Sequence, residues 1–184
     1  VWAVRDRFRA SVVATEKLSD PKSIAEKTMT LAHFYGVLCN QVFIDNFGIG
    51  ANVAVELAGA GFMPKALNVG DSPSKENETV YINLRAEAYW ELKQWLRSGG
   101  ELVGDRAKWE QLLTLRYRRE LSGKLKIMSK DDMGKEGLKS PDRADALMLT
   151  FTEPEVKVAN MMNSITAEKR HRRQQRSRFS AVVG

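Results

Sequence analysis

The fold is predicted from Val42-Phe-Ile-Asp45, a stretch that continues directly into Asn46-Phe-Gly-Ile-Gly50. A short apolar run that ends in a carboxylate and then breaks at glycines is typical of a buried strand followed by a turn and a helix. The pattern therefore places Asp45 at the end of a strand, at the edge of a sheet. The next segment, residues 48–59, is expected to be the helix that follows this strand.

A second acidic stretch, Ser-Pro-Asp-Arg-Ala-Asp-Ala-Leu at residues 140–147, has the features of a helix start. Ser140 is a favourable N-cap, and Pro141 suits the first helical position. Asp142 and Asp145 are three residues apart and so share one face of a helix. The apolar residues that follow predict that Asp145 borders the buried face of this helix.

Strand-like and helix-like segments alternate around these two stretches, which indicates an α/β domain. The clearest amphipathic helix spans residues 84–96, with Arg85 and Glu87 assigned to its polar face. Residues 70–80 are polar and are expected to form a surface loop. The other expected strands are residues 1–5, 8–18, 66–69, 115–120 and 124–128, and the other expected helices are residues 21–35, 109–113 and 141–153.

Composition indicates a folded, soluble protein. The 184 residues and the hydrophobic share of 43% are enough for one domain with a core. No apolar run approaches the roughly 20 residues that a membrane-spanning helix requires, and no signal-peptide pattern opens the sequence. We therefore expect an intracellular protein with no membrane partner.

Trp90, Trp95 and Trp109 are expected in the core, and Cys39 is expected to be a buried small residue without a chemical role.

The formal net charge of +6 is concentrated at one end. Residues 1–155 are predicted to form the folded domain, and residues 156–184 a basic C-terminal arm. A basic run is complementary to phosphate or to an acidic partner, and such runs are also commonly only solvated, so both interpretations stay open. The candidate nucleic-acid contacts in the arm are Lys169, Arg170, Arg172 and Arg173, and Lys130 is a further candidate phosphate contact in the folded domain.

The two acidic stretches point to hard divalent cations and phosphate chemistry. Carboxylate oxygens are preferred ligands of Mg²⁺ and Mn²⁺, and phosphodiester cleavage by two metals needs carboxylates that converge. Asp45 and Asp145 meet this requirement if the two element ends lie on the same side of a sheet. A turn or cap role remains open for Asp45, and stabilisation of a helix start remains open for Asp142.

Other chemistries have weaker support. Gly48 and Gly50 follow a strand and precede a helix, but a dinucleotide-binding fingerprint wants a small residue where Val53 stands. No P-loop motif occurs in the sequence. Neither His33 nor His171 has a partner that suggests a zinc site or nucleophilic catalysis.

Four motifs together resemble the C-terminal nuclease domain of the large terminase subunit of tailed bacteriophages. They are Val42–Gly50, Asn83-Leu-Arg-Ala-Glu-Ala-Tyr89, Ser129-Lys-Asp131 and Ser140–Leu147. The resemblance runs from about the first residue to Phe151. It implies an RNase H-like α/β fold, with a mixed central sheet flanked by helices and an acidic cluster that binds Mg²⁺ or Mn²⁺ to cut concatemeric viral DNA.

Carried over by motif, Asp45 and Asp145 match two metal-binding acids of that family, and Asp142 stands where some relatives carry a further ligand. The resemblance also implies several partners: double-stranded DNA, the terminase ATPase motor domain, the small terminase subunit and the portal protein. The implied location is the cytoplasm of a bacterial host.

The sequence departs from the family pattern in one respect. The family's first acid lies on a preceding strand, and no residue here matches it; Asp6, the only early candidate, is expected at the tip of a hairpin. Either a longer protein or a degenerate prophage product would explain this. In both cases we expect these residues alone to bind metal weakly and cleave poorly. A catalytically inactive prophage remnant, or a DNA-binding or assembly module that keeps the fold, is the alternative function, and a small Rossmann-like nucleotide binder is a third.

Overall fold

The computed structural model describes residues 1–153 of the chain. The predicted domain boundary at residues 155–156 lies outside the described residues, as does the predicted basic arm with Lys169, Arg170, Arg172 and Arg173. The strands are β1 Trp2–Arg5, β2 Arg9–Ala14, β3 Phe43–Asp45, β4 Lys65–Leu67, β5 Glu101–Val103, β6 Tyr117–Arg119 and β7 Leu125–Ile127. The α-helices are α1 Pro21–Tyr35, α2 Ile49–Gly59, α3 Leu84–Arg97, α4 Arg106–Trp109, α5 Gln111–Thr114, α6 Lys130–Lys135 and α7 Asp142–Leu149, and two 3₁₀ turns span Cys39–Gln41 and Lys75–Asn77.

The strands form three separate groups within the described residues. β1, β2 and β5 form a mixed sheet, in which β1 and β2 are antiparallel and β2 and β5 are parallel. β3 and β4 pair in parallel, and β6 and β7 form the predicted hairpin. The expected mixed sheet is present as β1, β2 and β5, and within residues 1–153 the β3–β4 pair lies outside it. β3 hydrogen-bonds only to β4, and no described strand connects it to β1.

The helices at the start of the chain form where the sequence predicts them, because their capping residues are in place. The Asp20 side chain accepts a hydrogen bond from Ser23 N at 2.8 Å, and Gly36 ends α1 with φ of 65°. Gly50 has a different role: a Cβ at this position would overlap the carbonyl oxygen of Asp45. The glycine allows α2 to begin directly against the end of β3.

The sequence did not predict β5 and α6, and both ends of α7 differ from their predicted positions. β5 was missed because its three residues, which follow a glycine pair, are too few to show a hydrophobic period. Its strand conformation is stabilised by pairing with β2. α6 begins at Lys130, and the side chain of its N-cap Ser129 accepts from Asp132 N at 3.1 Å. In α7, Pro141 instead of Ser140 is the N-cap, because the Ser140 hydroxyl donates to the Asp142 carboxylate. The helix ends at Leu149, earlier than predicted.

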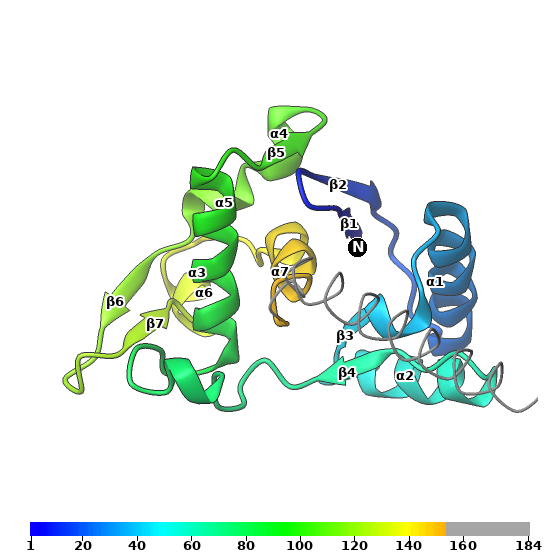
Figure 1. Cartoon of the computed structure of the whole chain (residues 1–184), viewed down its shortest axis with the longest axis horizontal. Helices are drawn as coiled ribbons and strands as arrows, with labels where there is room; N and C mark the ends of the chain where they lie inside the picture. Colours follow the sequence, from blue (N-terminus) through cyan, green and yellow to red (C-terminus); the bar gives the residue numbers. More distant parts are fainter. Residues whose placement is uncertain (154–184) are drawn as a thin grey trace, which may run out of the picture. The chain divides into compact units, whose positions relative to one another are not determined.

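Helix α7 lies at the centre of the described domain. It contacts β1, β2 and β3 as well as α3, and Figure 1 shows it between β1 and α3. Its buried residues Leu147 and Met148 belong to the largest hydrophobic cluster, together with Val12, Leu92 and Trp109. α7 therefore contacts both the three-stranded sheet and the β3–β4 pair. A separate small cluster joins α1 to α2.

Helix α3 departs from its predicted pattern, because Arg85 and Glu87 do not lie on a solvated face. Glu87 is 8% exposed and accepts hydrogen bonds from Ser74 N, Ser74 Oγ and Asn77 Nδ2, so it anchors the loop at residues 70–80. Arg85 is also largely buried, and it donates a hydrogen bond to Asp145 of α7. The expected core positions of the tryptophans are confirmed for Trp109, whereas Trp90, Trp95 and the free Cys39 are only partly buried.

None of the helices in residues 1–153 has the length and apolarity needed to cross a bilayer.

Candidate functional site

Asp45 ends β3, as the sequence predicts. Its carboxylate is partly buried, and within the described residues its Oδ1 atom is buried without a hydrogen-bond partner. A turn or cap role would require this carboxylate to accept hydrogen bonds from nearby backbone N–H groups. A buried acceptor without a partner is costly in a folded protein and is a common feature of ligand sites. The geometry therefore favours the ligand interpretation of Asp45 over the capping one.

Asp145 lies on α7 and is held firmly by residues of α3. Its Oδ1 accepts a hydrogen bond from Tyr89 OH at 2.6 Å and one from Arg85 Nη2 at 3.1 Å. Lys130 Nζ lies 3.0 Å from Oδ2, but no hydrogen bond of good geometry reaches this buried oxygen. This contact is an ion pair, and the Lys130 side chain is 53% exposed, whereas that of Arg85 is 12% exposed.

The structure brings Asp45 and Asp145 together, although 100 positions separate them in the sequence. α7 contacts β3. Burial raises the pKa of Asp45, and the negative charge of Asp145 raises it further, while the positive charges of Lys130 and Arg85 oppose both effects. Two carboxylates and two cations therefore share one electrostatic environment, and each carboxylate has one buried oxygen that accepts no hydrogen bond.

This arrangement fits one divalent cation. Two carboxylates with oxygens that accept no hydrogen bond are a common protein contribution to Mg²⁺ or Mn²⁺ binding, with water or substrate phosphate completing the coordination. No group of three or more His, Cys, Asp or Glu residues that could hold a metal occurs in residues 1–153. Asp45 and Asp145 are thus the acids available at this site within the described residues, and binding of a second metal would need further ligands.

The remaining predicted residues have different positions. Asp142 is exposed, accepts a hydrogen bond from Ser140 Oγ at 2.5 Å, and is not among the charged groups that act on Asp45. Asp6 lies at the turn between β1 and β2, as predicted, where its side chain accepts from Phe8 N and Arg9 N. Its carboxylate is satisfied by this turn, so Asp6 cannot replace the acid that the resemblance implies on an earlier strand.

Sequence reasoning assigned no role to Arg85 and Tyr89, which hold Asp145. They are four residues apart on α3, so their side chains share one face of the helix, and this spacing within Asn83–Tyr89 was the available signal. Burial and the charge of Asp145 raise the pKa of Tyr89 well above its usual range. Tyr89 therefore stays protonated and acts as a hydrogen-bond donor.

Tyr89→Phe removes one donor from Asp145 and is expected to lower stability by about 1.5 kcal/mol, because a buried hydrogen bond to a charged acceptor is lost. Urea unfolding would measure the change. Tyr35→Phe is the matched control, since this tyrosine is 44% exposed and should lose almost nothing. Equal effects of the two substitutions would show that the Tyr89 hydroxyl contributes no net stability.

The raised pKa of Asp45 predicts a pH dependence. The folded protein keeps the Asp45 proton to higher pH than the unfolded chain, so stability falls as pH rises from the unfolded pKa of about 3.9 through the folded pKa. Asp45→Asn cannot titrate, so the stability advantage of this variant over the natural protein should grow across that range and then level off. Thermal unfolding without metal at a series of pH values checks this. A constant difference between the two proteins would contradict it.

Comparison with solved structures shows which proteins share this fold. The nuclease domain of the large terminase subunit gp2 of bacterial virus Sf6 aligns with a TM-score of 0.67 at 22% identity, covering 83% of this chain and 81% of that domain. A mutant of the same domain with manganese aligns with a TM-score of 0.68 at 22% identity, over 83% and 82% of the two chains. The large terminase nuclease of thermophilic phage G20c gives a TM-score of 0.51 at 19% identity, over 76% and 66%.

No protein-family model matches the chain. No curated protein matches it either. The structural likenesses establish the fold: the chain has the architecture of phage terminase nuclease domains, and the expected RNase H-like α/β class is confirmed.

Proposed function

We propose that this chain is the metal-dependent endonuclease domain of a phage DNA-packaging terminase large subunit, which cuts concatemeric viral DNA. One observation carries the proposal: Asp45 and Asp145, distant in sequence, lie near enough for the charge of Asp145 to raise the pKa of Asp45, and each has a buried carboxylate oxygen that accepts no hydrogen bond. The fold that this chain shares with terminase nuclease domains supports it, including the domain solved with manganese.

In this proposal each residue of the site has a distinct role. Asp45 and Asp145 would hold Mg²⁺ or Mn²⁺, which when bound would activate a water molecule and stabilise charge on the phosphate. Arg85 and Tyr89 fix the Asp145 carboxylate in position. Lys130, more than half exposed beside Asp145, can contact a DNA phosphate. Asp142 would be a supporting ligand only if its exposed carboxylate turned towards the pair.

The proposed partners follow from the same function. Double-stranded DNA would be the substrate, and the motor domain, the small terminase subunit and the portal protein would be assembly partners in the cytoplasm of a bacterial host. The basic residues Lys169, Arg170, Arg172 and Arg173 would add DNA contacts. The presence of only two acids at the site within the described residues favours a second candidate, an inactive remnant or DNA-binding module with the same fold.

Incubation of the full chain with supercoiled plasmid and Mn²⁺ tests the proposal. Nicked and linear products that disappear with EDTA are expected, at a low rate because the site has two acids. Repeating the assay with any natural residues encoded before Val1 separates the two candidates. A large increase in cleavage supports the enzyme, whereas DNA binding without cleavage in both versions supports the module.

A further inference from the structure

A second concave site, lined in part by Tyr89, lies between α3 and the segment that leads into the β6–β7 hairpin. Its volume is about 440 Å³, which is within the range of sites that bind ligands or large side chains. Its walls are mainly apolar, with Leu92, Leu96, Leu112 and Leu115 among the lining residues. Asp45, Asp145 and Lys130 do not line it, so this pocket is distinct from the candidate metal site.

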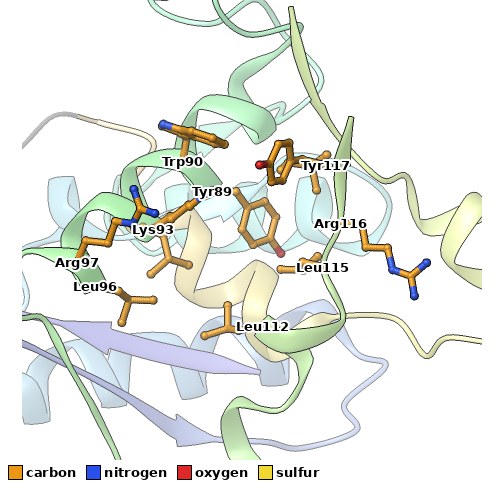
Figure 2. Close-up of a pocket in the computed structure, with 11 residues that line it drawn as sticks. Tyr89, Trp90, Lys93, Leu96, Arg97, Leu112, Leu115, Arg116 and Tyr117 are labelled. Carbon is orange, nitrogen blue, oxygen red and sulfur yellow. The ribbon is translucent and has the colours of Figure 1, made fainter. Parts of the chain in front are cut away.

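The pocket is positively charged. Lys93, Arg97 and Arg116 line it, whereas no Asp or Glu does, and Figure 2 shows Lys93 and Arg97 on one side and Arg116 on the other. Within residues 1–153 neither Lys93 nor Arg97 forms an ion pair. Arg116 pairs with Glu136 at 3.0 Å, but both side chains are exposed, and such a pair is easily exchanged. An anionic ligand would therefore contact cations whose charge is only weakly neutralised by neighbouring acids.

Two aromatic side chains hold Lys93 at this pocket. Its Nζ lies 4.1 Å from the Trp90 ring centroid and 5.0 Å from that of Tyr117, and the two rings meet edge to face at 5.4 Å. Nucleic-acid bases stack on open ring faces, and here Lys93 lies over both rings. The apolar walls and the covered rings favour an apolar side chain over a nucleobase.

We propose that this pocket docks an acidic segment of a partner protein. One or two large apolar side chains of the segment would enter the cavity, and flanking Asp or Glu residues would pair with Lys93, Arg97 and Arg116. Tyr117 lines the cavity but is 55% exposed, so a peptide that continues past the pocket would cover surface that a small molecule would leave open. This proposal does not depend on nuclease activity.

Fluorescence anisotropy with the full chain tests the docking site. The probe is a labelled peptide with a central Trp-Leu pair flanked by glutamates, and binding is expected. A peptide with lysines in place of the glutamates, and a peptide with Gly-Ser in place of Trp-Leu, should each bind at least about tenfold more weakly. No binding of the first peptide at millimolar concentration, or equal binding of all three, would overturn the proposal.

Two substitutions locate the binding site. Arg97→Glu should weaken binding of the acidic peptide by roughly three- to tenfold, whereas Arg106→Glu, the same change at an exposed arginine outside the pocket, should have little effect. Leu96→Trp would fill part of the cavity and should weaken binding while the protein stays folded by circular dichroism. Equal effects of the two arginine substitutions would count against the site. Displacement of the peptide by a single-stranded oligonucleotide would instead identify a nucleic-acid surface.

Discussion

Asp145→Ala is expected to eliminate manganese-dependent cleavage of plasmid DNA and to remove the stabilisation of the protein by Mn²⁺. The substitution deletes one of the two carboxylates that have a buried oxygen without a hydrogen bond. Outer-shell partners of metal ligands alone contribute roughly 10–100-fold to affinity or activity, so loss of a ligand should cost at least about 100-fold. Titration of Mn²⁺ by calorimetry measures binding independently of cleavage.

Asp145→Ala also leaves Arg85 and Tyr89 without their acceptor, which is expected to cost about 2 kcal/mol of stability. Asp145→Asn separates the two effects, because the amide oxygen can still accept from both donors while the charge is lost. Asp71→Ala is the matched control at an exposed loop position. Unchanged cleavage after Asp145→Ala would remove this residue from the mechanism and with it the proposed function.

Leu147→Ala is expected to destabilise the domain by about 3 kcal/mol, which corresponds to a fall in melting temperature of about 10 °C. Leu147 is fully buried on the inner face of α7, within the largest hydrophobic cluster. Truncation leaves a cavity beneath the helix that carries Asp145. Thermal unfolding followed by circular dichroism measures the effect.

Leu113→Ala is the control for this prediction, because Leu113 is 73% exposed and its truncation should change stability by less than about 0.5 kcal/mol. Similar shifts for the two variants would mean that α7 is not part of the stable core. If Leu147→Ala also weakens Mn²⁺ binding, the packing of α7 sets the geometry of the candidate site.

The sequence predicted those parts of the fold whose signals are local. α1 has an Asp cap and a Gly stop, and the strand that ends at Asp45 precedes glycines whose freedom is needed there. β5 could not be predicted, because its three residues owe their conformation to pairing with β2 and not to their own pattern. The division of the strands into separate sheets depends on long-range pairing and has no local signature.

The acidic pair was predictable because each acid interrupts an apolar pattern at an element end. The residues that support it were not, since Arg85 and Glu87 look like ordinary members of a solvated helix face. Their burial depends on the elements that pack against α3. Arg85 donates a hydrogen bond to Asp145 of α7, and Glu87 accepts one from Ser74 in the loop at residues 70–80. Predicting these contacts requires the tertiary arrangement.

One consequence concerns how the site would respond to mild heating. Asp45 is attached to a strand pair that shares no backbone hydrogen bond with the three-stranded sheet, and Asp145 is tethered to α3 through side-chain bonds alone. The distance between Asp45 and Asp145 is thus maintained by side-chain packing and not by hydrogen bonds between backbone strands. The affinity for Mn²⁺ should consequently decline at temperatures at which the backbone amide signals in NMR spectra still indicate intact strands. The two acids would then separate before the domain unfolds.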